Sequence, residues 1–396
     1  MKKIKKYALL SIILTGTASV WAIETGGLIT NNSSFKTNSE QDFKLDQVNR
    51  ASLWLRAPIS ADGKSYFAGE ALYEFEKDFD EDTTTHTLDS DLFKLVLYKK
   101  QGTNNFFLSA GRFFYSDLSN YVYGQNADGL LLDYSGIHLG VSAFGAYTGL
   151  LNSHTTSMIS SDAFGDEDAF EKDTDVLYDL AEKYVVGALT LRLKNLAGHD
   201  ISGQFLGTFR VENNPFNRMY ATVSFNGPVV RGVYYNAGTT FGFYSYDGSS
   251  VKTSNLSNAS LTYYTSGSIP ASVGLSGVYA SGEQGGLSPF IGFTKATATY
   301  SYEEPIYSGI IKAGLHASVK PIKPLLLSAS GDVVFDAASG DDSDEIEYTG
   351  FQYQVGAHWQ VLSDVMLGAN LTQYFDKDND DDKNRTSIQI KAVISF

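Results

Sequence analysis

Most of this chain alternates between apolar and polar residues with a period of two, which indicates β-strands whose two faces meet different surroundings. Between Ile201 and Glu212, Phe205 and Phe209 occupy one face, while Gln204 and Arg210 occupy the other. Similar alternation recurs in 351–359 and 365–372. Helical periodicity is confined to short patches, so the pattern predicts an all-β protein.

Tracing the alternation predicts about 18 strands. Short connections fall after every even-numbered strand and long, often acidic ones after odd-numbered strands, which is typical of a transmembrane antiparallel up-and-down β-barrel with short periplasmic turns and long outer loops. Because the first run and the segment 281–303 are weakly patterned, 16 strands is the alternative. The expected runs are 24–36, 43–57, 65–77, 91–100, 105–115, 128–135, 137–148, 184–195, 200–212, 217–226, 230–246, 256–266, 269–281, 304–319, 324–337, 347–360, 363–375 and 385–396.

The aromatic content and the last strand favour a membrane barrel over a soluble β-sandwich. Aromatic residues make up 13% of the chain, and many lie near strand ends, as interfacial girdles require. The final run, 385–396, alternates apolar residues and ends on Phe396. It resembles the closing strand of outer-membrane proteins, which implies that Phe396 is a signal read by the barrel assembly machinery.

The N-terminus has the pattern of a secretory signal peptide. Four of the residues between Met1 and Lys6 are lysines, a short apolar stretch follows, and small residues close with Ala22. The apolar stretch is far shorter than the roughly 20 residues of a spanning helix. We therefore expect residues 1–22 to be removed on export and 23–396 to form a single outer-membrane barrel domain.

Composition narrows the class of function. The absence of cysteine excludes a disulfide framework and thiol chemistry. The 45 acidic residues exceed the 30 basic ones and concentrate between the expected strands. Without a basic patch, nucleic acid is not an expected partner. No cofactor is expected, and an Asp-rich stretch at 376–380 departs from the calcium-loop pattern at the positions of its Gly and Glu, so no metal site is expected either.

The polar face of each strand is expected to line a lumen, because charges on a lipid-facing surface cost about 2–4 kcal/mol at the bilayer midplane. Barrels of 16–18 strands leave an aqueous channel. The sequence thus predicts a porin or substrate-preferring channel that passes small polar solutes by diffusion. The charged residues assigned to the lumen are Arg50, Arg56, Glu70, Glu74, Lys94, Arg112, Asp133, Arg192, Arg210, Arg218, Lys312, His316, Asp332 and His358.

A constriction is expected where an outer loop, 116–127, folds inward with Asp117 and Tyr121. Glu70 and Glu74 facing Arg112 and Lys312 would create a transverse electric field across the lumen. The alternative is that these charges pair and fill space. The candidate residues of the constriction and lumen are Glu70, Glu74, Arg112, Asp117, Tyr121, Arg192, Arg210, Lys312 and His316.

The stretch 110–117, Ala-Gly-Arg-Phe-Phe-Tyr-Ser-Asp, followed by 126–133, Asn-Ala-Asp-Gly-Leu-Leu-Leu-Asp, resembles large Gram-negative porins, including the alginate-export type. In those proteins a Gly-Arg strand, an inward loop and an Asp-Gly re-entry follow one another. The resemblance implies a monomeric or trimeric barrel in outer-membrane lipid that conducts small polar or anionic solutes. This chain departs from it by lacking a ladder of arginines, so anion selectivity does not follow.

Two other functions fit the same architecture. Acidic outer loops would suit a surface adhesin, and a barrel could also carry hydrophobic solutes as the fatty-acid transporters do, although the polar stretch 30–46 is short for an N-terminal hatch. No motif connects His86 or His154 to a catalytic partner, so an enzyme is not expected. The longest connection, 149–183, could form a lid, a plug, a partner site or an ordinary surface loop, with a short amphipathic helix over 173–183.

Overall fold

The computed structural model describes residues 23–37, 43–159, 176–211, 216–246, 250–283, 286–296, 308–337, 346–377 and 384–396. These residues contain 19 antiparallel strands in one sheet. No helix among them is long and apolar enough to cross a membrane. The strands are β1 (Glu24–Thr37), β2 (Phe43–Pro58), β3 (Tyr66–Asp78), β4 (Thr83–Asp89), β5 (Phe93–Gln101), β6 (Asn104–Ser116), β7 (Gly124–Ser135), β8 (Leu139–Tyr147), β9 (Tyr184–Leu196), β10 (His199–Arg210), β11 (Phe216–Val230), β12 (Val233–Tyr246), β13 (Lys252–Tyr264), β14 (Ala271–Ala280), β15 (Ile310–Ile322), β16 (Leu325–Asp336), β17 (Glu347–Gln360), β18 (Val365–Asp376) and β19 (Arg385–Ser395).

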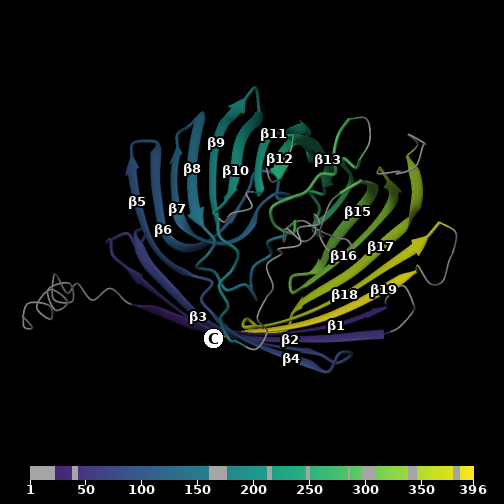
Figure 1. Ribbon diagram of the computed structural model, residues 1–396, viewed down its shortest axis with the longest axis horizontal. Coiled ribbons are helices and arrows are strands. Elements are labelled where there is room, and N and C mark those ends of the chain that lie inside the picture. Colours follow the sequence, from purple (N-terminus) through teal and green to yellow (C-terminus); the bar gives the residue numbers. More distant parts are fainter. Residues whose placement is uncertain are drawn as a thin grey trace, which may run out of the picture.

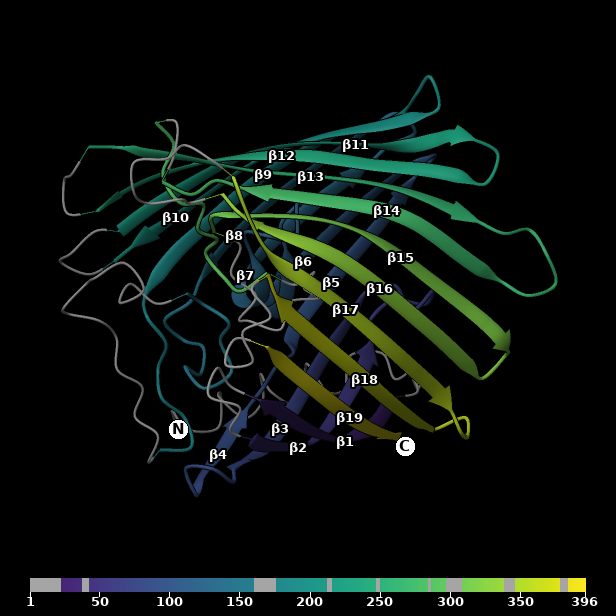
Figure 2. The same cartoon turned by 90° about the vertical axis from the view of Figure 1, so that its right-hand side faces the viewer.

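The sheet closes on itself, because β1 pairs with both β2 and β19 (Figure 1). The ladder between β1 and β19 runs from Leu28 opposite Ser395 to Lys36 opposite Ser387. Short turns join strands at one end of the barrel and longer connections at the other, as the sequence predicts. Figure 2 shows the strands inclined along the barrel wall, the tilt that closure requires.

β4 and β5 share one position in the wall. β3 pairs with β4 along Leu72–Asp78 and with β5 along Tyr66–Gly69, so the two short strands succeed one another beside the same neighbour. The barrel therefore has 18 strand positions, which confirms the predicted number and excludes 16. β4 was not expected from the sequence, because Thr83–Asp89 carries four threonines, a histidine and Asp89, and Leu88 is its one apolar residue.

The wall is discontinuous where β4 leaves off. β5 begins with Phe93 opposite Arg112 of β6, and no ladder joins β4 to β6 in the described part of the chain. Segments 150–152 and 177–178 of the β8–β9 connection occupy this gap, which we call the wall seam. The Leu88 amide donates to the Leu177 carbonyl at 3.1 Å, and the Asn152 amide group donates to the Leu88 carbonyl at 3.2 Å.

The two faces of the barrel differ as a membrane protein requires. Large apolar side chains remain exposed around the outside, where water would be an unfavourable neighbour. Examples on six different strands are Leu53, Leu132, Leu189, Phe205, Leu275 and Val355. The alternate positions of the same strands carry serine, threonine, asparagine, glutamine and charged residues that face the interior.

Parts of three connections fold into the barrel and pack together: 153–159, 117–123 and 286–296, which we call the inward loops. The Phe293 amide donates to the Val122 carbonyl at 2.8 Å, and the Ile159 amide donates to the Phe293 carbonyl at 3.0 Å. Their apolar residues form the core of the molecule against β6–β11, β13 and β14. The Phe293 ring stacks on Tyr123 at 5.7 Å and meets Tyr184 edge-on at 4.9 Å.

Candidate functional site

Three cavities adjoin one another along the strands β11–β19, and the inward loop 117–123 lines two of them. Their volumes are about 410, 250 and 300 Å³. The first and second share Tyr121 and Ser276, and the first and third share Lys312. Together we call them the polar passage, because serine, threonine, asparagine, glutamine and charged side chains supply most of their lining.

The alternation of β14–β17 builds the wall of the largest cavity. Successive inward positions place hydroxyl, amide and charged groups side by side on neighbouring strands: Ser272 and Ser276, then Lys312, His316 and Ser318, then Ser328, Ser330 and Asp332, and finally Gln354. Glycines at cross-strand positions leave room for the larger groups. A Cβ at Gly274 would overlap the His316 ring, and a Cβ at Gly314 would overlap the Asp332 carboxylate.

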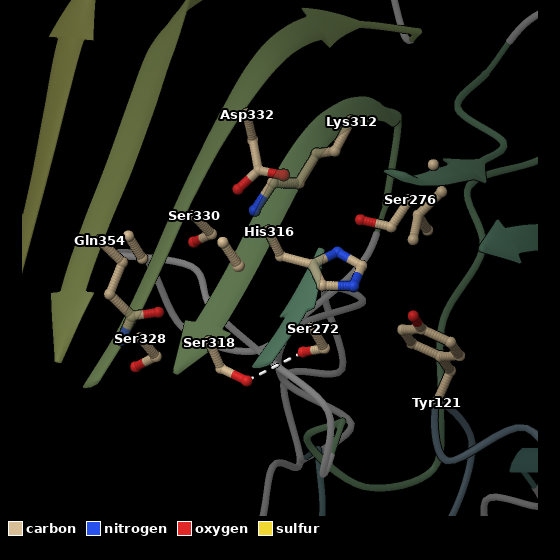
Figure 3. A pocket seen from close by; sticks show the side chains of 14 residues that line it. Tyr121, Ser272, Ser276, Lys312, His316, Ser318, Ser328, Ser330, Asp332 and Gln354 are labelled. Carbon is tan, nitrogen blue, oxygen red and sulfur yellow. Dashed lines mark hydrogen bonds between the residues drawn. The ribbon is translucent and has the colours of Figure 1, made fainter. Parts of the chain in front are cut away.

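Figure 3 shows how these side chains lie. The Lys312 ammonium group points toward the Asp332 carboxylate, and the His316 ring lies beside them on the same strand as Lys312. The hydroxyl groups of Ser272 and Ser318 are hydrogen-bonded at 2.8 Å. Tyr121 enters the cavity from the opposite side, on an inward loop. The cavity therefore has a polar wall facing an aromatic ring.

The inward loop 117–123 is held in shape by Asp117, whose side chain is buried. Its carboxylate accepts hydrogen bonds from the backbone amides of Ser119, Val122 and Tyr123 at 2.7–3.1 Å. Burial raises the pKa of Asp117, while its hydrogen bond from Ser119 opposes that shift. The Leu118 amide donates to Gln204 of β10 at 2.9 Å, which ties the loop to the wall. Asp117 thus shapes the turn that presents Tyr121, and burial raises the pKa of the Tyr121 phenol, so the ring is uncharged.

Arg218 of β11 anchors the other two inward loops. Its guanidinium donates to the carbonyls of Gly292 at 2.9 Å and Ile159 at 3.3 Å, one on each loop. It also lies over the rings of Phe216 at 4.3 Å and Phe293 at 5.3 Å. The residue is only 1% exposed, so these contacts are shielded from water.

Of the residues that the sequence assigns to the lumen, Tyr121, Lys312, His316 and Asp332 come together in the largest of these three cavities. Other lumen candidates take part in ion pairs: Arg50 with Glu74 at 3.2 Å, Arg192 with Asp133 at 3.0 Å, and Arg210 with Glu182 at 2.9 Å. Arg210 and Glu182 are each 4% exposed, so that pair joins β10 to the β8–β9 connection away from water. Glu70 lies on β3, and it is not among the residues that line the polar passage.

Arg112 lies at the wall seam and is not among the residues that line the passage. It alternates with Phe113, whose ring is buried in the inner core, so its side chain leaves β6 on the side of the exposed Phe114. Its guanidinium pairs with Asp128 at 2.7 Å and Asp89 at 3.0 Å. It also donates to the Leu150 carbonyl at 2.6 Å. Arg112 therefore links segment 150–152 to β4 on one side of the gap and to β6 and β7 on the other.

Sequence reasoning did not find the 286–296 loop or the serine-rich wall. An apolar run, Pro289–Phe293, within a long polar connection was the available signal for the loop. Residues 176–183 are not helical, so the described part of the expected amphipathic helix is wrong. Within the described ranges, no three His, Cys, Asp or Glu residues gather as a metal site would require.

Comparison with solved structures identifies the fold. Against OccK9 (OpdG) of Pseudomonas aeruginosa, the TM-score is 0.62 at 10% sequence identity, and the match covers 94% of this chain and 98% of that one. OpdL of the same organism gives 0.59 at 13% identity, covering 94% and 98%, and its outer membrane protein OprD gives 0.59 at 10%, covering 94% and 93%. No family model and no curated protein sequence matches. The chain therefore has the closed 18-strand barrel fold of these outer-membrane proteins, which it resembles over almost its whole length.

Proposed function

We propose that this chain is an outer-membrane channel through which small polar solutes diffuse, along a water-filled lumen narrowed by the inward loops. The observation that carries the proposal is the polar passage: three adjoining cavities lined by hydroxyl, amide and charged groups inside a barrel with an apolar exterior. Large barrels conduct through such polar interiors. The fold shared with OprD and OccK9 (OpdG) supports the same function.

In this proposal the candidate residues divide into two groups. Tyr121, Lys312 and His316 line the largest cavity of the passage. The remaining candidates hold the wall and the inward loops in place: Glu70, Glu74, Arg112, Asp117, Arg192 and Arg210. The Glu70 amide, for example, donates to the Leu92 carbonyl at 2.7 Å, between β4 and β5.

Export and assembly complete the proposal. Residues 1–22, which lie outside the described residues, would direct export as a signal peptide, leaving 23–396 as the barrel domain in outer-membrane lipid. The alternating strand that ends at Phe396 would be read by the assembly machinery, and the barrel would act as a monomer or a trimer. Residues 30–37 and 43–46 belong to β1 and β2 in the wall, which disfavours a carrier with an N-terminal hatch there.

The full chain, folded in detergent and added to planar lipid bilayers, should produce stable single-channel current steps. A barrel whose interior is polar and hydrated conducts ions whenever it spans the bilayer. Heat-modifiable migration on gels would first establish that the preparation is folded, and unfolded protein would be the control. A folded barrel that inserts and remains silent would contradict the channel and favour an adhesin.

Replacing Lys312 by Ala should shift the reversal potential in a salt gradient toward stronger cation preference. The change removes a positive charge from the lining of this cavity and leaves the Asp332 carboxylate there. Lys320→Ala is the matched control, because Lys320 is an exposed lysine near the turn that ends the same strand. Equal reversal potentials for the wild type and both variants would show that Lys312 does not lie on the ion pathway.

A further inference from the structure

We propose that the largest cavity of the polar passage, between Tyr121 and the strands β14–β17, is a binding site for small solutes that are uncharged overall and carry several hydroxyl groups. The inference rests on the proposed channel function and names the class of solute that the channel prefers. It is carried by the balance of charge, the hydrogen-bonding groups and the shape of this one cavity.

The charges that line the cavity balance. Lys312 contributes one positive charge and Asp332 one negative charge, and the Lys312 ammonium group points toward the Asp332 carboxylate (Figure 3). With His316 counted as neutral, the lining has a formal charge of zero at pH 7. A site that concentrates anions needs an excess of positive charge. Of the arginines on other strands, Arg50, Arg192 and Arg210 each pair with a carboxylate.

The hydrogen-bonding groups suit hydroxyl groups better than carboxylates. Five serines and Gln354 line the cavity, and each hydroxyl or amide can both donate and accept. The Ser272–Ser318 hydrogen bond at 2.8 Å is a hydroxyl pair in which either oxygen can be the donor. A solute hydroxyl can exchange into such a network in either role. An ionised carboxylate only accepts, so it would leave the acceptors of this wall without donors.

The shape of the cavity fits the same class of solute. Its volume of about 410 Å³ is within the range of about 300–1,000 Å³ found for small-molecule sites. Tyr121 faces the serine wall, so a compact polyol or monosaccharide can place its C–H surface on the aromatic ring and its hydroxyl groups on the strands. Aromatic side chains combine apolar contact area with low conformational-entropy cost.

The test uses the full chain in planar bilayers, with ion current as the readout and sorbitol as the probe. Sorbitol should reduce the wild-type current in a saturable way. Tetraethylene glycol is similarly small and neutral, but it carries few hydroxyl groups, so it should cause only the linear reduction expected from viscosity. Gluconate, which differs from sorbitol mainly by its carboxylate, should bind at least about fivefold more weakly, because loss of one or two matched hydrogen bonds costs that much.

Variants locate the site. Tyr121→Ala and the double variant Ser328→Ala/Ser330→Ala should each weaken the apparent affinity for sorbitol about fivefold or more. Tyr121→Phe, which keeps the aromatic ring, should bind sorbitol within about twofold of wild type. Ser52→Ala is the control, because Ser52 is a buried serine on β2 that does not line the cavity.

The possible failures are distinguishable. A wild-type chain that gives no current contradicts the channel itself, and the solute class falls with it. Normal current steps with equal responses to sorbitol and tetraethylene glycol, or tighter binding of gluconate than of sorbitol, would overturn the solute class and leave the channel standing. Saturable sorbitol block that none of the cavity variants weakens would overturn the location.

Discussion

Replacing Arg218 by Met should produce a channel with larger and noisier current than the wild type. The guanidinium is the shared donor to carbonyls on two inward loops, and removing it leaves the acceptors of Gly292 and Ile159 buried without that donor. Each unsatisfied buried acceptor costs about 1–3 kcal/mol, so the free energy that keeps the loops docked should fall by about 2–6 kcal/mol. Since each 1.4 kcal/mol is a factor of about ten, undocked states should become at least tenfold more populated.

Single-channel recording measures this effect as excursions above the main conductance level. Arg231→Met is the control, because Arg231 is an exposed arginine in the tight turn that follows β11. Arg218→Lys keeps the charge but lacks the forked geometry that reaches two carbonyls, so it should fall between Met and wild type. A conductance histogram unchanged in a folded Arg218→Met barrel would show that the inward loops do not depend on this anchor.

Replacing Arg112 by Met should destabilise the barrel by about 3–5 kcal/mol. Arg112 pairs with Asp89 and Asp128 across the wall seam, and the Asp89 side chain is only 4% exposed. Removing the cation leaves the buried Asp89 carboxylate with hydrogen bonds from Ser90 and Thr155 but without a counter-charge, which costs far more than the loss of an exposed pair. The change also removes the donor to the Leu150 carbonyl, so segments 150–152 and 177–178 at the wall seam should become accessible to proteases.

Urea unfolding in micelles, followed by tryptophan fluorescence, measures the first effect, and limited proteolysis near Leu177 measures the second. Arg56→Met is matched: Arg56 also pairs with a carboxylate, Glu24 at 2.9 Å, but both side chains are at least 30% exposed, and such pairs contribute about 1 kcal/mol or less. Adding Asp89→Asn to Arg112→Met should recover part of the loss. Equal destabilisation by the Arg56 and Arg112 changes would exclude a special role for the seam.

The barrel could be predicted from sequence because its two faces meet media as different as lipid and water. Alternation then appears strand by strand, and the placing of short and long connections follows from it. β4 was missed because it lacks this alternation. Thr83–Asp89 lies where the wall is interrupted, and its residues form no apolar face. Arg112 was assigned to the lumen because a charge that faces lipid is costly, and this assignment was wrong. Its side chain leaves β6 on the outer side, where Asp89 and Asp128 at the wall seam neutralise its charge.

The interior of the barrel was less predictable than its wall. An inward loop around Tyr121 follows from its length and its position after β6, although the structure shortens it, because β7 begins at Gly124. The docking of Phe293 on Tyr123 depends on residues far apart in the chain, and local periodicity carries no record of such contacts. The serine wall was also missed, because small polar residues alternate on most strands and the sequence does not show which of them line the same cavity.

The pairing of β1 with β19 has a consequence for biogenesis. The first and last strands of the chain are mutual neighbours, with Gly27 and Phe396 exchanging two backbone hydrogen bonds at 2.8 and 3.1 Å. The barrel cannot close until β19 is available to pair with β1, so the outer edge of β1 keeps unpaired backbone groups while the other strands assemble. The inward loops must also enter the barrel before that last ladder forms, so the open edges of the incomplete sheet are exposed to mispairing until then.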